Sequence, residues 1–406
     1  MALVVQKFGG TSVADPERIR SVADHVARTR RKGDDVIVVV SAMGKETDEL
    51  IRLAEEVASV QPSREMDMLL TVGERKTTAL LCMALADLGI EAESFTGSQA
   101  GIITDTEHTK AKIVEVRPDR IRDCLAAGKV AVVAGFQGVS TDREITTFGR
   151  GGSDNTAVAL AYSLGGDSFE KYSDVPGIFS ADPRVVPNAR KLSRLTIEEM
   201  LEIAATGSGV LMFRAVEFAR NHGIRIHVRS SFSWEPGTWV VPEAELQEDP
   251  SMSMEQPIIS AVTHDTSEAK VTVNRVPDQP GIAARLFRSL AEKNVNVDMI
   301  VQNVSHDGTT DISFTVPKSD LDRALEACSH HGDAVTKDDQ IAKVSIVGAG
   351  MKSHPGVSAT MFETLAASSI NIEMISTSPI RLTCVVRADQ VEQAVQVLHD
   401  AFELGV

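Results

Sequence analysis

Two glycine-rich stretches of this sequence combine residue types that bind anions. The first is Lys7-Phe8-Gly9-Gly10-Thr11-Ser12, which follows a short apolar run near the N-terminus. Adjacent glycines let the backbone approach a ligand closely, and successive N–H groups can form an anion-binding concavity beside the lysine. The spacing differs from GxxxxGK[ST], which excludes an ordinary P-loop. Taken alone, the stretch is explained equally by a tight turn between a strand and a helix.

The second stretch, Gly149-Arg150-Gly151-Gly152-Ser153-Asp154, opens an alanine-rich segment that we expect to be helical. The free N–H groups and the positive dipole end of a helix N-terminus favour an anion. Arg150 can form a bidentate pair with a carboxylate. Asp154 lies in the first turn, where a carboxylate is electrostatically favoured. A capped helix start is the alternative explanation.

Two other segments carry polar and charged residues at the ends of expected elements. Glu74-Arg75 begins a helix after Thr71-Val72-Gly73, where an exposed ion pair is the alternative to a binding role. The segment from Ser173 to Arg184 is a long loop punctuated by glycine and proline. Ordered functional loops have this composition, but so do ordinary ones.

Length and charge restrict the class of protein that carries these motifs. The 406 residues correspond to two or three domains, and the net charge of −16 disfavours nucleic acid and acidic membrane surfaces as partners. The four cysteines are scattered without a CxxC pair, which argues against a zinc site and favours a reduced, cytoplasmic protein. The N-terminus has no signal-peptide pattern, and no apolar run is long enough to span a membrane.

The elements that position the motifs alternate between strands and helices. Short apolar runs at 3–6, 36–41 and 130–134 predict strands that are covered on both faces. Longer helical patterns at 16–31, 48–60 and 74–88 lie between them. This alternation predicts an α/β domain with a mostly parallel sheet, whose ligands bind at the carboxyl ends of the strands.

The C-terminal part contains an internal repeat. Ala269-Lys270-Val271-Thr272-Val273 matches Ala342-Lys343-Val344-Ser345-Ile346 at an offset of 73, and Asp298-Met299-Ile300 matches Glu373-Met374-Ile375 at an offset of 75. Each copy reads as strand, Pro-Gly loop, helix, strand, strand, helix and strand, which predicts a βαββαβ ferredoxin-like module. Two modules that only pack are the alternative, but the loop residues coincide in both copies.

In this order and spacing the motifs resemble those of aspartokinases, most closely the single-function actinobacterial type, over nearly the whole chain. Further matching segments are Ser41-Ala42-Met43, Ser94-Phe95-Thr96-Gly97-Ser98-Gln99-Ala100-Gly101, Ser180-Ala181-Asp182-Pro183-Arg184, Gly348-Ala349-Gly350-Met351 and Ser376-Thr377-Ser378. The resemblance implies an α/β fold: an amino-acid-kinase-type three-layer αβα sandwich followed by two ferredoxin-like ACT domains. We therefore expect a catalytic domain at 1–241, a linker at 242–264 and ACT domains at 265–335 and 336–406.

The resemblance also implies an activity, the ATP-dependent phosphorylation of the L-aspartate side chain to 4-phospho-L-aspartate, the first step towards lysine, threonine and methionine. Lys7 would neutralise the transferring phosphate, and Asp154 would organise the phosphate end. The residues expected at ATP are Lys7, Gly9, Gly10, Ser41, Ser173, Asp174, Phe179 and Arg184. Those expected at aspartate are Thr47, Glu74, Arg150, Gly151, Gly152 and Ser153. Mg²⁺ would bridge the phosphates with few protein ligands.

Two departures from the family pattern lie at the nucleotide end. Pro176 stands where the family usually has aspartate, and Gly209 stands where it usually has lysine. Loss of one charge-assisted contact to a phosphate costs about 1.5–3 kcal/mol, which is roughly a ten- to hundredfold loss of affinity. We therefore hypothesise weakened or altered ATP use. Two alternatives follow: a paralogue with altered nucleotide or acceptor use, and a catalytically weak amino-acid sensor.

The ACT pair implies regulation by an amino-acid end product, lysine or threonine or both. The residues expected at the effector are Asp278, Asn296, Val297, Asp298, Gln302, Thr360, Asn371, Ile372 and Glu373. Pro379 departs from the family, which usually has glutamate there, so the effector's identity stays open. The family also implies a homo-oligomer or an α₂β₂ assembly, whose β chain would start internally at Met252 or Met254.

Overall fold

The computed structural model describes residues 2–149, 151–247, 259–303 and 308–405, which form two compact units. The first unit comprises Met1–Ile178, Lys191–Ala204 and Gly209–Met252. The second comprises Phe179–Arg190, Ala205–Ser208 and Ser253–Val406. The sequence places the boundary in a linker at 242–264. Two short segments that lie earlier in the chain nevertheless belong to the second unit.

An eight-stranded sheet forms the centre of the first unit. Its strands, in spatial order, are β10 (Arg194–Thr196), β12 (Thr238–Val241), β11 (Arg225–Ser230), β9 (Ser168–Ser173), β1 (Leu3–Phe8), β2 (Asp35–Val40), β6 (Val130–Ala134) and β3 (Ala92–Phe95). All neighbours are parallel except β11 and β12, which confirms the predicted α/β sheet. Strands β2 and β6 consist almost wholly of buried Val, Ile and Ala, as expected for strands covered on both faces.

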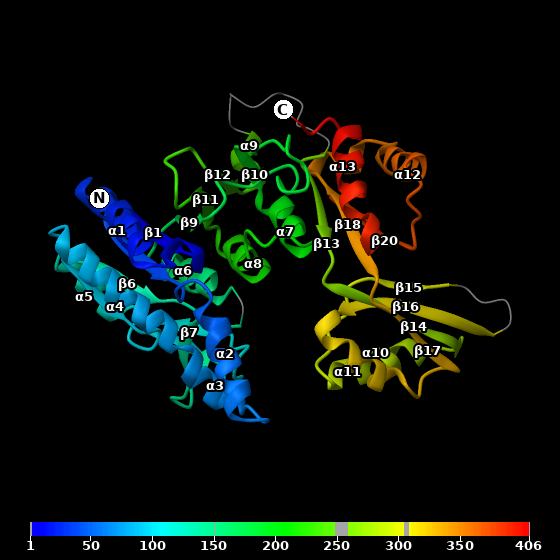
Figure 1. Ribbon diagram of the computed structural model, residues 1–406, viewed down its shortest axis with the longest axis horizontal. Coiled ribbons are helices and arrows are strands. Elements are labelled where there is room, and N and C mark those ends of the chain that lie inside the picture. Colours follow the sequence, from blue (N-terminus) through cyan, green and yellow to red (C-terminus); the bar gives the residue numbers. More distant parts are fainter. Residues whose placement is uncertain (1, 150, 248–258, 304–307, 406) are drawn as a thin grey trace. The chain divides into compact units, whose positions relative to one another are not determined.

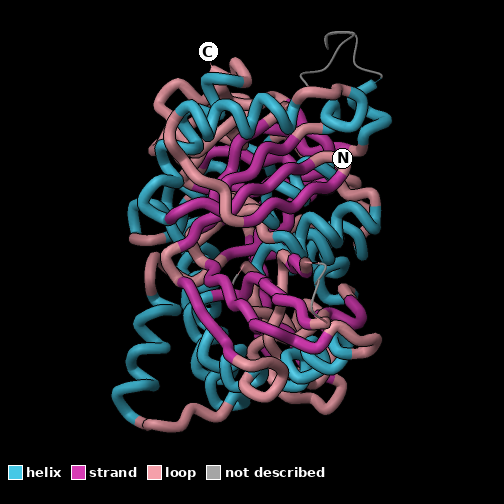
Figure 2. Tube along the Cα trace, turned by 90° about the vertical axis from the view of Figure 1, so that its right-hand side faces the viewer, coloured by secondary structure: helices cyan, strands magenta, loops and turns pink. Residues whose placement is uncertain are grey.

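Helices cover this sheet (Figures 1 and 2). Those of the first unit are α1 (Pro16–Arg31), α2 (Glu46–Val57), α3 (Ser63–Leu70), α4 (Val72–Asp87), α5 (Asp119–Ala126), α6 (Gly152–Ser163), α7 (Ile197–Ala205), α8 (Phe213–His222) and α9 (Glu243–Gln247). Asp15 caps α1 by accepting a hydrogen bond from Arg18 N at 2.9 Å. Helix α6 is buried from Gly152 to Ala161, so it lies inside the unit and holds its first turn firmly.

A second, smaller sheet in the first unit has no counterpart in our sequence-based prediction. Its strands are β5 (Ile113–Val116), β4 (Ile102–Thr104), β7 (Gln137–Ser140) and β8 (Ile145–Thr147). Each has only three or four residues, too few for an alternating pattern to stand out. Strand β8 ends directly before the glycine-rich stretch that opens α6.

The first repeat of the second unit folds as predicted. It consists of β14 (Glu268–Pro277), α10 (Ile282–Glu292), β15 (Ile300–Gln302), β16 (Thr309–Pro317), α11 (Leu321–Cys328) and β17 (Ala334–Asp338). The sheet order β15-β16-β14-β17 places the first and third strands at the centre, as in a ferredoxin-like module. Leu286 and Leu290 of α10 pack with Val271 and Phe314 in its core.

The second repeat differs from the prediction in its fourth strand. It comprises β18 (Ile341–Val347), α12 (Val357–Ala367), β19 (Met374–Ser378), β20 (Arg381–Arg387) and α13 (Val391–Ala401). The edge position beside β18 is taken by β13 (Ala261–Asp265), which precedes the first repeat and which we assigned to the linker. The first module is thus inserted into the second. The local sequence pattern of a strand does not show which strand it pairs with. The pairing of β13 with β18 could therefore not be predicted from the sequence.

The segment Phe179–Arg190 packs into the core of this second module. Ala181, Val185, Val186 and Ala189 are buried among residues of β18, β20 and α13. Ser180 Oγ lies 2.9 Å from His399 Nε2 and donates to Leu404 O at 3.1 Å. Among the described helices, none is both long and apolar enough to cross a membrane.

Candidate active site and regulatory site

A buried cluster of two lysines and one aspartate lies at the carboxyl ends of the central strands. Lys7 on β1 and Lys171 on β9 are register partners in parallel strands, so their side chains lie on the same face. Lys7 Nζ is 2.8 Å from Asp154 Oδ1, and Lys171 Nζ contacts Asp154 Oδ2. All three residues are more than nine-tenths buried.

Two ammonium groups around one carboxylate leave a net positive charge in this cluster. Burial opposes ionisation of Asp154, but Lys171 and Lys7 outweigh it and lower the pKa of Asp154 to about 2. Burial lowers the pKa of Lys171 to about 8, although Asp154 partly opposes this shift. The first turn of α6 adds its positive dipole end to the same place. The arrangement therefore suits a multiply charged anion.

Glu74 is a buried carboxylate with no cationic partner among the residues that the structure describes. It lies in the first turn of α4, and its Oε1 accepts a hydrogen bond from Ala42 N at 3.1 Å, whereas the buried Oε2 accepts none from the described residues. Burial raises the pKa of Glu74 to about 7, against the backbone hydrogen bonds, which lower it. An ammonium group placed here would restore the missing interaction and favour the charged form.

The chain after β2 links Glu74 to the lysine cluster. Ala42 N donates to Glu74, and the preceding Ser41 Oγ donates to Ser153 Oγ at 3.1 Å. Ser153 is adjacent to Asp154 in the first turn of α6. The structure thus brings together Lys7, Ser41, Glu74, Ser153 and Asp154 from four separate motifs. Thr47, in the first turn of α2, is half-buried nearby in the chain.

Glycines of the two motifs lie where neighbouring protein atoms leave little room for a side chain. Gly9 N donates to Tyr172 O at 3.3 Å, a contact that joins the first motif to the end of β9. A Cβ on Gly10 would lie 3.1 Å from the carbonyl oxygens of Ala42 and Gly44. Gly151 has φ of 76°, and a Cβ there would collide with Met212. Gly152 is similarly confined against Phe148. Arg150 itself lies outside the described residues.

The residues expected at the nucleotide fall into two groups. Ser173 ends β9 and Asp174 follows it, two and three residues after Lys171, and Ser173 Oγ donates to Asp174 Oδ1 at 3.2 Å. Phe179 instead packs against the core of the second module, and Arg184 makes a bidentate pair with Asp182. Both belong to the second unit. Lys7 belongs to the first unit, so the expected role of these two residues at the nucleotide stays a prediction.

The two departures from the family pattern differ in their surroundings. Pro176 precedes Gly177, which has φ of 150° and lies against Thr238 Oγ1 and Lys191. Gly209 has open space around it, since an added Cβ would meet no atom within 4 Å. A Cβ at position 209 is therefore sterically permitted.

Sequence reasoning missed Lys171. A lysine in the strand sequence Ser-Phe-Glu-Lys-Tyr-Ser does not stand out from other charged strand residues. A usable signal was the two-residue alternation, because Phe169 and Lys171 share one face and both are buried. A buried lysine requires a carboxylate partner, and Asp154 was the candidate.

In the regulatory part, the two acids expected at the effector are paired with lysines of the opposite repeat. Lys343, at the repeated Ala-Lys-Val position of the second module, lies 2.7 Å from Asp298 of the first. Lys270, at the same position of the first module, contacts Glu373 of the second. Each repeat thus supplies its lysine to the acid of the other.

The lysines differ in their number of acidic partners. The buried Lys343 Nζ is also 2.9 Å from Glu268 and 3.7 Å from Asp265, so three carboxylates surround one ammonium. Burial opposes the charge, but Glu268 and Asp298 raise the pKa of Lys343. Glu373 is shared by two cations, because Arg387 Nη1 lies 3.1 Å from it.

The remaining expected effector residues lie at the loops and strand ends of the two modules. Asp278 N donates to Gly308 O at 2.9 Å, and Thr360 N donates to Gly356 O at 2.8 Å. Gln302 ends β15, and the other residues, Asn296, Val297, Asn371 and Ile372, precede β15 or β19. The exposed ones are Asp278, Asn296, Gln302 and Asn371. Met252 and Met254 lie outside the described residues.

Comparison with known proteins identifies both parts of the chain. Residues 2–230 match the amino acid kinase family, and residues 271–331 and 344–402 match the ACT domain. An aspartokinase of Corynebacterium efficiens is 54% identical over 413 aligned positions, which cover 100% of this chain and 97% of the relative.

Solved structures agree with this assignment. E. coli aspartokinase III in complex with aspartate and ADP, in its R-state, is 25% identical with a TM-score of 0.84, covering 98% of this chain and 99% of the other. The same enzyme with lysine and aspartate, in its T-state, is 26% identical with a TM-score of 0.74, over 98% and 99% of the two chains. These likenesses extend over both units.

Proposed function

The chain belongs to the aspartokinase family, whose members phosphorylate the side-chain carboxylate of L-aspartate with ATP, and from this premise we propose how its own residues perform the reaction. Attack of the carboxylate oxygen on the γ-phosphorus forms the acyl phosphate, and the bond to the β-phosphate breaks to release ADP. No proton need be removed from the nucleophile, because a carboxylate is ionised at neutral pH. Catalysis then consists of positioning and charge neutralisation.

Lys7 and Lys171 neutralise the transferring phosphoryl group. The two ammonium groups are held by one buried carboxylate, Asp154, so their donors are oriented before the nucleotide arrives. Asp154 is itself a positioning residue, because both its oxygens are occupied by the lysines. Ser41, Gly9, Gly10, Ser173 and Asp174 surround this point along the strand ends and contribute to the nucleotide site.

The aspartate substrate is held at its α-amino and α-carboxylate groups. Glu74 pairs with the ammonium, which supplies the partner that its buried Oε2 lacks. Arg150 pairs with the α-carboxylate, beside Gly151, Gly152 and Ser153 at the start of α6, and Thr47 completes the pocket. With both ends of the amino acid fixed, the side-chain carboxylate is directed towards the lysine cluster.

We expect Mg²⁺ to enter this site as part of the nucleotide complex. Among the described residues there is no group of three His, Cys, Asp or Glu side chains that could hold a metal ion, and Asp154 is occupied by the lysines. Mg²⁺ bound to the phosphates of ATP supplies further charge neutralisation. Asp174, exposed beside the cluster, is the carboxylate available to its hydration shell.

The ACT pair places the activity under feedback control by an amino acid. We propose lysine, threonine or both as effectors, which bind through the acids Asp298 and Glu373 and the loops beside them. E. coli aspartokinase III has been solved with lysine, which supports this class of ligand. The protein works in the cytoplasm, where ATP and free amino acids are available, as a homo-oligomer or with an internally started regulatory chain.

The observation that carries the proposal is the combination of the Lys7–Asp154–Lys171 cluster with the unpartnered carboxylate of Glu74. The test is a coupled ADP-release assay with MgATP and L-aspartate, with hydroxylamine present to trap the acyl phosphate as a hydroxamate. We expect aspartate-dependent ADP release with matching hydroxamate, reduced by lysine plus threonine at millimolar concentration. Release that is unchanged by omitting aspartate would contradict the proposed acceptor.

A further inference from the structure

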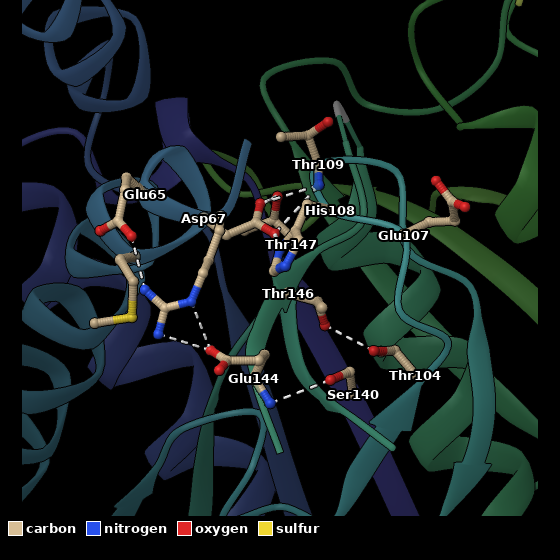
Figure 3. Close-up of polar contacts among 12 residues, drawn as sticks. Glu65, Asp67, Thr104, Glu107, His108, Thr109, Ser140, Glu144, Thr146 and Thr147 are labelled. Atoms are coloured by element: carbon tan, nitrogen blue, oxygen red, sulfur yellow. Dashed lines mark hydrogen bonds and ion pairs between the residues drawn. The ribbon is translucent and has the colours of Figure 1, made fainter. Parts of the chain in front are cut away.

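A buried aspartate outside the proposed site connects three segments of the first unit. Asp67 on α3 is fully buried, and its carboxylate lies 2.6 Å from His108 Nδ1. It accepts hydrogen bonds from Thr147 Oγ1 at 2.6 Å and from Thr109 N at 3.1 Å. Figure 3 shows these groups converging on Asp67 from the 105–112 loop and from the end of β8. Asp67 belongs to none of the sequence motifs of the proposed site.

The backbone at Thr109 is strained, and Asp67 holds it in place. Thr109 has φ of 65°, a left-handed conformation that is unfavourable for a β-branched residue. Such a conformation persists only where neighbouring groups fix it, and strain of this kind gathers at functional sites. A Cβ on Gly149 would lie 3.2 Å from Thr109 O, so the strained residue directly adjoins the stretch that leads into α6.

The end of β8 is fixed on its remaining sides by backbone contacts. Ala111 N donates to Thr147 O at 2.9 Å, and Arg214 Nη1 of α8 donates to Phe148 O at 3.2 Å. Thr147 is two residues before Gly149, and we call Gly149 and Gly151, which precede α6, the acceptor loop because of the role proposed above for this stretch. Its starting point is therefore set by Asp67 through a side chain and by Ala111 and Arg214 through the main chain.

We propose that Asp67 is a positioning residue for aspartate binding, which acts by holding Thr147 and Thr109 at the base of the acceptor loop. The inference rests on the proposed function, since it assigns the loop to the amino-acid substrate. Loss of the Asp67–Thr147 contact displaces the loop and weakens aspartate binding. MgATP binding is largely spared, because Lys7 and Lys171 are held by strands of the large sheet.

The neighbouring residue provides a matched control. Thr146 is also fully buried on β8, but its hydroxyl pairs with Thr104 at 2.7 Å and makes no contact with Asp67 (Figure 3). Thr146→Val and Thr147→Val therefore remove the same group, from the same strand, at the same burial. Only Thr147→Val removes a donor from the carboxylate of Asp67.

The experiment measures KM for aspartate, KM for MgATP, kcat and the melting temperature of the full chain for both variants and for Thr147→Ser, which keeps the hydroxyl. We expect Thr147→Val to raise the KM for aspartate about tenfold, while its KM for MgATP changes less than twofold. Thr146→Val should leave both constants within twofold, and Thr147→Ser should restore the wild-type value. Asp67→Asn, which keeps one acceptor oxygen, should raise the same KM at least as much.

The outcomes separate this inference from the proposed function. An inactive wild-type protein would contradict both. Active wild type with the same aspartate KM in Thr146→Val and Thr147→Val would overturn the positioning role alone. The positioning role would also be overturned if Thr147→Val lowered the melting temperature and raised the KM for aspartate and the KM for MgATP equally. That result would indicate a purely structural effect.

Discussion

The two halves of the protein both contain carboxylates paired with a buried lysine, but with opposite balances of charge. In the catalytic unit, Lys7 and Lys171 share one carboxylate, Asp154. In the regulatory unit, Lys343 alone faces Asp265, Glu268 and Asp298. The first cluster has a surplus of ammonium and suits phosphate. The second has a surplus of carboxylate and suits the ammonium group of an amino acid.

This difference shows that the net charge of the chain, −16, does not predict the local charge of either cluster. A buried charge interacts mainly with its immediate partners, because water no longer screens it and distant charges are weakened by the solvent. The function of each cluster is therefore decided by the ratio of cations to anions within a few ångströms. Substitutions that alter this ratio should separate the two roles.

The largest effect is expected from Lys171→Gln. It leaves Asp154 with one cation and removes the positive surplus, so we expect kcat to fall by about a hundredfold or more. Lys129→Gln is the control, since it removes a lysine that is partly exposed and only loosely paired with Glu93 at 3.7 Å. Steady-state kinetics of the two variants measure the contrast. Equal activity would mean that the cluster does not act on the nucleotide.

The next effect concerns stability and tests the regulatory cluster. Lys343→Met leaves three carboxylates facing each other, which should destabilise the second unit by about 3 kcal/mol. Lys270→Met, at the same position of the other repeat, should cost less because Arg387 still faces Glu373. Thermal unfolding with and without lysine or threonine measures both. A larger loss of stability in Lys270→Met than in Lys343→Met would contradict the proposed difference between the two lysines.

Glu74 shows a third balance of charge, because this carboxylate has no cationic partner among the described residues. Its pKa of about 7 means that the charged form, which binds an ammonium, is lost as pH falls below 7. We expect KM for aspartate to rise roughly tenfold between pH 8 and pH 6, since one pH unit below the pKa leaves about a tenth of the carboxylate ionised. Glu74→Gln should have a high KM without this pH dependence. An unchanged slope in that variant would assign the titration to another group.

The smallest effect is expected from Gly209→Lys, which adds positive charge at the position where the family pattern predicts a lysine near the nucleotide. A Cβ added at Gly209 meets no atom within 4 Å, so the first atom of the new side chain causes no collision. If the glycine weakens ATP use, the lysine should lower KM for MgATP by up to about tenfold while leaving KM for aspartate unchanged. Gly209→Met, of similar length without charge, is the control. An equal change in both variants would show that charge is not the cause.

The large sheet and its helices were predictable because buried strands of Val, Ile and Ala leave a continuous apolar signature. Helix α1 matches its predicted range, Pro16–Arg31, and β6 matches 130–134. The repeat likewise predicted the first ACT module. What these cases share is that the information lies within a few neighbouring residues.

The features that were missed depend on partners far apart in the sequence. Lys171 pairs in register with Lys7 across 164 residues, and β13 completes a sheet whose other strands begin at Ile341. The Asp67 contacts require the small sheet, whose strands are too short to be recognised. The lysine partners of Asp298 and Glu373, each from the other repeat, were likewise not predicted. Pairing of this kind is a property of the folded chain.

The segment Phe179–Arg190 has a consequence for how the protein can be divided. Its neighbours Ile178 and Leu192 are joined in the first unit by a backbone hydrogen bond of 2.8 Å, while its apolar residues are buried in the second. If the chain were divided once between 242 and 264, the N-terminal part would keep Phe179–Arg190 with its apolar side chains uncovered. The C-terminal part would lack these residues from its core. The two units therefore alternate along the chain and do not simply follow one another. Any separately made regulatory chain must find a substitute for those twelve residues, and the same loop of a complete chain is one that would fit.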